Sequence, residues 1–198
     1  VGDNVFSSVG SSPKAYIGFA ATGFGEATTW NGLTIVRADA SVAVNCSAGG
    51  SFTITDNVVT GNTDCVGAAV IPSSVISIVN YAFNNATALA SVTIPSSITS
   101  IGEMAFNRTT ALKTVTFASG SALTSIGTSA FNGASSLTSI NIPSSVTSIG
   151  SSAFSGTNSL TTISIPSSVT SIGNYAFNNA TALTSVTFEG NAPTASGT

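Results

Sequence analysis

IPSSVTSIGNYAFNNATALTSVT, residues 165–187, is the stretch that decides the fold, because the same pattern occurs four more times directly before it. Each copy starts at the residue before Pro-Ser-Ser or its equivalent, and the copies are 23, 23, 25, 23 and 23 residues long. They occupy residues 71–93, 94–116, 117–141, 142–164 and 165–187. A repeat of this length is typical of a solenoid in which every copy forms one coil.

Apolar residues recur at fixed places in every copy and are separated by Ser, Thr, Asn and Gly. We expect the apolar side chains to point inward and the polar ones to face water. Val186 and Phe188 alternate around an outward Thr187, which is the period of a strand. This pattern predicts a parallel sheet through residues 89–94, 112–117, 137–142, 160–165 and 183–188. It also predicts one buried column of phenylalanines, formed by Phe83, Phe106, Phe131, Phe154 and Phe177.

A glycine follows an isoleucine that is expected to be buried in four copies, at positions 102, 127, 150 and 173. Glycine is favoured where the backbone adopts an unusual angle or approaches another chain segment closely. Either reason predicts a corner of the coil at these four positions.

These residues resemble the BspA-type leucine-rich repeat family, whose pattern is IPxxVxxIGxxAFxxCxxLxxV, and the resemblance covers all five copies. It implies a right-handed leucine-rich-repeat solenoid with a parallel β-sheet on one face and irregular or short helical turns on the other. It also implies cell-surface attachment or matrix binding and no shared catalytic activity. The family's frequent cysteine is replaced here by small residues without thiol chemistry: Ala86, Thr109, Ala134, Thr157 and Ala180.

Residues 1–37 break the period. Residues 1–6 match residues 172–177 position by position, which predicts the end of a preceding coil, followed by a C-terminal lid. A sugar-stacking site at Trp30 is the alternative function of this lid. Residues 188–198 begin a sixth coil, which we expect the next unit to continue.

Residues 38–70 form the predicted N-terminal cap. Val42 and Val44, then Phe52 and Ile54, alternate as in short strands, with turns at Gly49-Gly50, Asp56-Asn57 and Gly61-Asn62. A cap covers the sheet edge and the apolar cross-section that a first coil exposes. An alternative use of this segment is a calcium site with oxygen ligands from Asp56, Asn57, Asn62 and Asp64.

The two cysteines of the chain, Cys46 and Cys65, both lie in the cap. We expect a disulfide between them, which would indicate an oxidising compartment. Free or metal-binding thiols are the alternative, but the chain has no histidine and no third thiol. Four glycosylation acceptor patterns also favour secretion, with the acceptors Asn45, Asn85, Asn107 and Asn179. The last three fall in one turn of the coil, where we expect them to be exposed.

Composition excludes several functions. Four basic residues and a net charge of −3 do not provide the clustered Lys and Arg of a nucleic-acid site. No apolar run reaches the roughly 18 residues of a membrane span. Without histidine, Ser/His/Asp and Cys/His catalysis and the usual transition-metal sites are absent, and the acidic residues are scattered singly. We predict no enzyme, no metal and no cofactor.

One candidate surface for a ligand is a column of outward polar residues at about 4.8 Å spacing on the sheet. Its members are Thr93, Thr116, Asn141, Ser164 and Thr187. Such an array could bind ice or carbohydrate, while the simpler interpretation is a set of small β-formers on an uncharged surface. The second column is less uniform, with Ala90, Thr114, Ser139, Thr162 and Ser185.

The function predicted from these observations is that of a structural or adhesive protein, secreted and extracellular or on the cell surface. Its partners would be further copies of itself, head to tail in a filament or long tandem-repeat fibre, with glycans or matrix proteins as further candidates. The interface between copies would contain Val1, Val5, Phe6, Phe188 and Pro193. The alternative function is a carbohydrate- or ice-binding module.

Overall fold

The computed structural model describes residues 14–17, 29–30, 33–37, 41–191 and 193–195 of the chain. Two compact units, Val1–Ser41 and Val42–Thr198, make up the molecule. In the first unit, β1 (Lys14–Ile17) pairs in parallel with β3 (Leu33–Arg37), and β2 (Thr29–Trp30) pairs antiparallel with β3. The predicted interface residues Val1, Val5 and Phe6 and the side chain of Trp30 lie outside what the structure describes.

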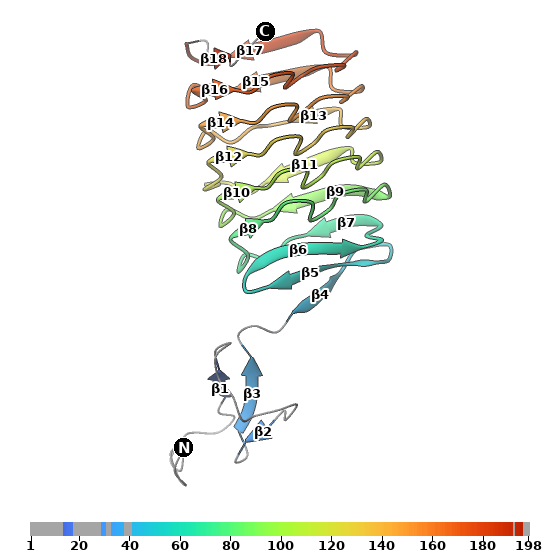
Figure 1. Ribbon diagram of the computed structural model, residues 1–198, viewed down its shortest axis with the longest axis vertical. Helices are drawn as coiled ribbons and strands as arrows, with labels where there is room; N and C mark the ends of the chain where they lie inside the picture. The colour runs from blue at the N-terminus through green and yellow to red at the C-terminus, as the bar shows by residue number, and fades with distance from the viewer. Residues whose placement is uncertain (1–13, 18–28, 31–32, 38–40, 192, 196–198) are drawn as a thin grey trace. The chain divides into compact units, whose positions relative to one another are not determined.

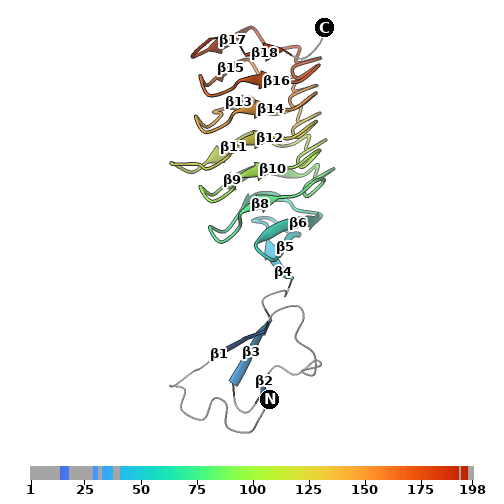
Figure 2. The ribbon, with the colours of Figure 1, turned by 60° about the vertical axis from the view of Figure 1, so that its left-hand side comes forward.

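The second unit is a β-solenoid of about six turns, whose coils stack along one axis in Figures 1 and 2. Its main sheet contains four parallel strands in sequence order: β7 (Gly67–Val70), β9 (Leu89–Ile94), β11 (Thr114–Phe117) and β13 (Ser139–Ile140). An isolated bridge between Asn141 and Ser164 leads to a parallel pair, β15 (Thr162–Ile165) and β17 (Ser185–Phe188). The predicted parallel sheet is therefore present, with shorter strands than expected after β9.

A second, narrow parallel sheet runs along another side of the coils and was not predicted from the sequence. Six two-residue strands form this part of a nine-stranded sheet, whose other three strands belong to the cap: β8 (Ser77–Ile78), β10 (Ser100–Ile101), β12 (Ser125–Ile126), β14 (Ser148–Ile149), β16 (Ser171–Ile172) and β18 (Thr194–Ala195). In each of the first five, the isoleucine points into the core, and the serine is half-buried. The described residues contain no helix, so turns rather than short helices complete each coil.

The turn side has its own regular hydrogen bonds between coils. In the first repeat, the backbone N–H groups of Tyr81, Phe83 and Asn85 donate to carbonyl groups of the next coil at 2.9, 2.7 and 2.9 Å. Tyr81 and Asn85 adopt left-handed backbone angles, with φ of 64° and 59°. This alternation turns every second N–H toward the neighbouring coil, so the turns form a third ladder beside the two sheets.

The phenylalanine column is confirmed. From Phe83 to Phe177, neighbouring rings are parallel within 6°, and their centroids lie 5.1–5.6 Å apart. Phe52 of the cap extends the column, with its centroid 5.5 Å from Phe83 and its ring tilted by 55°. One continuous apolar core therefore links the cap to the last coil.

The four predicted glycine corners are explained by close approach of backbone. A Cβ at Gly150 would lie 2.5 Å from the backbone nitrogen of Thr128, and one at Gly127 would lie 2.6 Å from the carbonyl carbon of Gly102. None of the four corner glycines has a positive φ. Of the two reasons that the sequence left open, close packing between coils is the correct one.

The cap is an antiparallel meander of β4 (Val42–Asn45), β5 (Ser51–Thr55) and β6 (Val58–Thr63), with β6 parallel to β8. The expected disulfide joins Cys46 to Cys65, with their Cα atoms 5.5 Å apart. Asp56-Asn57 forms the predicted turn. The turn predicted at Gly61-Asn62 is wrong, because both residues lie inside β6. The irregularity is a bulge in β6, where Thr60 is left over between the pairs Thr53–Gly61 and Ile54–Val59.

Candidate ligand-binding face

The first polar column lies on the outer face of the main sheet. Thr93 is in register with Thr116, and Ser164 is in register with Thr187. Asn141 bridges to Ser164 but is not in register with Thr116. All members are exposed except the half-buried Ser164, whose Oγ donates to Oε1 of Glu189 at 2.7 Å. The column therefore exists in two segments, with an interruption between Thr116 and Asn141.

The second polar column differs from the expectation by one residue. Thr114 is in register with Ser91, not with Ala90. Each of the two paired residues lies two positions after the recurring leucine of its own repeat, Leu89 or Leu112. From the first repeat onward, its members are therefore Ser91, Thr114, Ser139, Thr162 and Ser185, all with hydroxyls. The face is thus more uniform in chemistry than the sequence indicated.

The interruption of the first column coincides with the longer third repeat. Residues 118–122, Ala-Ser-Gly-Ser-Ala, stand where other repeats have Pro-Ser-Ser. β11 and β13 share two register pairs, Thr114 with Ser139 and Val115 with Ile140, whereas β9 and β11 share four. The register of these two strands therefore ends after Val115, beside the inserted loop.

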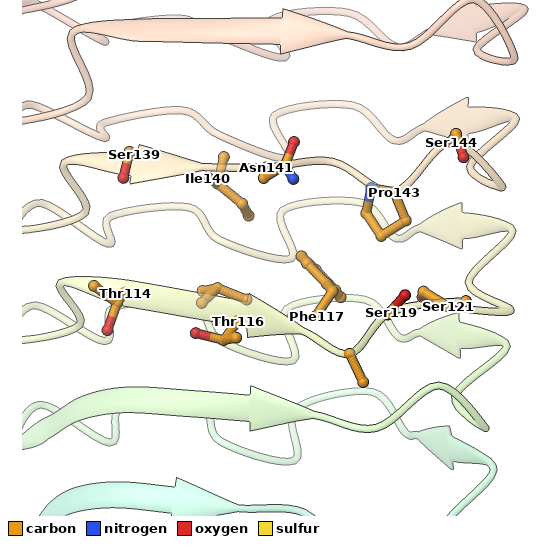
Figure 3. A pocket seen from close by; sticks show the side chains of 13 residues that line it. Thr114, Thr116, Phe117, Ser119, Ser121, Ser139, Ile140, Asn141, Pro143 and Ser144 are labelled. Carbon is orange, nitrogen blue, oxygen red and sulfur yellow. The ribbon is translucent and has the colours of Figure 1, made fainter.

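A groove of about 470 Å³ opens at this separation. β11 and the inserted loop form one wall, and β13 with the following Pro143 and Ser144 forms the other. Figure 3 shows the Phe117 side chain directed toward the β13 side and the Pro143 ring directed toward the β11 side. Thr116 and Asn141, the two column residues that lost their register, both line the groove.

Two apolar side chains at this groove, Phe117 and Pro143, are partly exposed to solvent. Phe117 is half-buried, whereas Ile94 and Ile165, which hold the same place in other repeats, are 0% and 1% exposed. Pro143 is half-buried, as is Pro72 of the first repeat, while Pro95 and Pro166 are buried. The third repeat has Ala118 in place of this proline.

The groove carries no formal charge. Its thirteen lining residues are hydroxyl, amide, small or apolar residues. Exposed hydroxyls and one amide surround the apolar centre: Thr114, Thr116, Ser119, Ser139, Asn141 and Ser144. Such a lining can donate and accept hydrogen bonds with a neutral polar ligand while an apolar part of that ligand covers Phe117 and Pro143.

The residues of the calcium hypothesis are not brought together. Asp56 and Asn57 precede β6, and Asp64 follows its last residue, so strand β6 separates them. The Asn62 side chain donates through Nδ2 to the carbonyl oxygen of Ala82 at 3.0 Å. Across the residues that the structure describes, no three His, Cys, Asp or Glu side chains cluster as metal ligands would.

The predicted glycosylation acceptors fall into two groups. Asn45, Asn85 and Asn179 are exposed. Asn107 is half-buried, contrary to the expectation, and its Nδ2 donates to Oδ1 of Asn84 at 2.8 Å. The reason is a shift of one position, since Asn107 directly follows Phe106, whereas Asn85 and Asn179 are two residues beyond their phenylalanines.

The predicted interface residues at the C-terminal coil are partly accessible. Phe188 is 43% exposed, although its equivalents in earlier coils are buried or half-buried, and Pro193 is half-buried. Strand β18 places Ala195 opposite Ile172. In the predicted joined coil this place belongs to Val1, so Ala195 occupies the position that the expected join assigns to the next copy.

The repeat pattern matches a family model, the BspA type leucine rich repeat region, in six copies over residues 53–184. The chain belongs to the BspA-type leucine-rich repeat family. Its first matched copy begins within the predicted cap. No curated protein matches the chain at a significant level.

Solved structures support the BspA-type fold. A leucine rich cell surface protein from Faecalibacterium prausnitzii is 34% identical with a TM-score of 0.68, over 81% of this chain and 43% of that one. A leucine-rich repeat protein of T. pallidum is 27% identical with a TM-score of 0.58, over 69% and 74%. The pneumococcal vaccine antigen PcpA shares the fold at 17% identity and a TM-score of 0.64, over 78% and 38%.

The chain spans less than half the length of the Faecalibacterium prausnitzii protein that it matches. Among the residues that the structure describes, no helix has the length and apolar character needed to cross a bilayer.

Proposed function

We propose that this chain is a structural and adhesive module of an extracellular or cell-surface protein, and not an enzyme. The single observation that carries this proposal is the uninterrupted core of residues 52–177, in which repeated coils stack ring on ring. Each coil contacts its neighbours alone, so such an array extends by adding coils. The cell-surface protein of Faecalibacterium prausnitzii, at 34% identity, supports the location.

The cap supports an extracellular location by a second route. The disulfide between Cys46 and Cys65 joins the turn after β4 to the segment after β6. Disulfides persist in oxidising environments and are rare in the cytosol. The exposed acceptors Asn85 and Asn179 are the sites at which we expect glycans if the source organism glycosylates such sequences.

The proposal also includes head-to-tail assembly of copies of this chain. Val186 and Phe188 are 37% and 43% exposed in β17, which is an edge strand of the two-stranded sheet that it forms with β15. An unpaired edge strand with apolar side chains is a template for a further strand. A following coil supplied by another copy would bury both side chains, and repetition of this open contact would give a filament.

The test is electron microscopy and sedimentation of the full chain at rising concentration. The proposal predicts particles that lengthen end to end, and a Phe188→Ser variant that stays monomeric. Val70→Ser is the matched control, because Val70 is 60% exposed on β7 at a distance of several coils from β17. Compact oligomers, or equal association of the Phe188→Ser variant, would contradict assembly through this edge.

Covalent continuity needs a separate measurement. In a chain of two copies joined in tandem, we expect slower amide hydrogen exchange in residues 183–188 of the first copy than in a single copy. Equal exchange would show that the joined copy does not cover β17.

A further inference from the structure

We propose that the groove of the third repeat is a binding site for a neutral carbohydrate, occupied by one or two sugar rings. This inference rests on the proposed adhesive function, for which it names a ligand class and a site. The groove lies between β11 and β13, beside the corner loop in which the third repeat has two inserted residues.

The size of the groove fits a small ligand. Its volume of about 470 Å³ lies in the range of roughly 300–1,000 Å³ that small-molecule sites occupy. The main sheet is interrupted once more, between β13 and β15, which share the single bridge of Asn141 with Ser164, but that repeat has the usual 23 residues and no inserted loop. The groove therefore lies beside the one corner loop of the five repeats that has two additional residues.

The chemistry of the lining fits a sugar ring. A pyranose has an apolar C–H face and hydroxyls around its rim. Phe117 and Pro143 offer partly exposed apolar surfaces from opposite walls, as Figure 3 shows. Around them, the hydroxyls of Thr116 and Ser139 and the amide of Asn141 can each donate and accept hydrogen bonds.

The absence of charge in the lining selects among carbohydrates. Anionic sugars require cationic or backbone donors to offset the loss of hydration of their charge, and no Lys or Arg lines the groove. A neutral ligand pays no such cost. The site should therefore prefer neutral oligosaccharides to sialylated or sulphated ones.

The geometry favours carbohydrate over ice. Ice recognition needs a flat and regularly spaced array, but the first polar column loses its register between Thr116 and Asn141. The same interruption that disturbs a flat array creates the concave site that a sugar ring requires.

The test measures binding of the full chain to an array of neutral hexose and N-acetylhexosamine oligosaccharides, with sialylated and sulphated ones beside them. Asn141→Ala and Thr116→Ala should weaken binding about tenfold each, the effect of losing one or two hydrogen bonds. The matched controls are Ser164→Ala and Thr93→Ala, which change the same column outside the groove and should alter binding less than twofold.

A loop variant closes the groove while keeping the repeat. Replacing residues 118–122 with Pro-Ser-Ser restores a 23-residue repeat, and it should abolish binding without unfolding the chain. Phe117→Ile, which places the isoleucine of other repeats here, should weaken binding by removing the aromatic ring.

Three results would overturn the inference. They are no binding of any neutral oligosaccharide, a preference for charged ones, and equal losses in the Thr93→Ala and Thr116→Ala variants. None of these results affects the microscopy and sedimentation measurements, which test the proposed assembly independently.

Discussion

The third repeat and the repeats on either side of it share a core but differ at one corner. Phe131 stacks on Phe106 and Phe154 at 5.2 and 5.5 Å, as regularly as any other ring of the column. The corner loop of the same repeat has two additional residues and shortens the pairing of β11 with β13. Stacking therefore constrains the side chains and backbone that meet the neighbouring coils, while the corner loop tolerates insertion and can acquire a local function.

The largest effect should come from breaking the shared core of the third repeat. Phe131 is fully buried, and Phe131→Ala should lower the free energy of unfolding by about 3–5 kcal/mol, because it removes the ring and leaves a cavity. Denaturant unfolding measures this loss. Thr138→Ala, an exposed position of the same repeat, is the control and should change stability by less than about 0.5 kcal/mol. Similar losses in both variants would contradict the assigned core.

The cap differs from the repeats because a disulfide cross-links it. Replacing both Cys46 and Cys65 by serine should cost about 3 kcal/mol, since the unfolded chain regains the freedom of a loop with a sequence separation of 19. Thermal unfolding of the wild-type chain with and without reductant checks this value. No difference would show that the cross-link does not stabilise the cap.

Gly150 and Gly156 are required for different reasons, the first for close packing between coils and the second for the backbone angle of a turn. Gly150→Ala should destabilise by about 1–3 kcal/mol, because its Cβ would meet the backbone of Thr128 at 2.5 Å. Gly156→Ala should cost about 1 kcal/mol, because its nearest neighbour is 3.6 Å away but its φ is +69°. Unfolding in urea compares the two. A larger loss of stability in Gly156→Ala than in Gly150→Ala would indicate that close approach of the backbone is not the reason for glycine at the corners.

The smallest effect on stability should follow from shortening the corner loop of the third repeat. Replacing residues 118–122 with Pro-Ser-Ser should change the free energy of unfolding by less than about 1 kcal/mol. The entropic cost of closing a loop rises only with the logarithm of its length, so removing two residues has a small effect. It should also extend the register of β11 and β13 from two pairs to four, as in β9 and β11. A crystal structure of this variant would show the extension, and a loss of several kcal/mol would contradict a tolerant corner.

The features that recur in every repeat could be predicted from the sequence. Phe83 to Phe177, the corner glycines and the strand positions recur at a fixed period, so comparison of copies was sufficient to find them. The disulfide followed from Cys46 and Cys65 being the two cysteines of the chain. The turn at Asp56-Asn57 followed from local residue preferences.

The missed features depend on contacts between coils. Two-residue strands such as Ser100–Ile101 are too short to show alternation, although the recurring Ser-Ile pair was a signal for them. Left-handed φ at Tyr81 and Met104 is unusual for such residues, and hydrogen bonds to the following coil stabilise it. The groove was missed because an insertion of two residues shows where a repeat is irregular but not which side chains it uncovers.

The claim that the specific site of this face is the irregular corner, and not the repeated columns, is tested most directly by amide hydrogen exchange of the full chain. The exchange is measured with and without a mixture of neutral hexose and N-acetylhexosamine tetrasaccharides. The account predicts slower exchange confined to residues 114–121 and 139–144. Protection spread evenly along the columns from Thr93 to Thr187, or no protection at all, would contradict it.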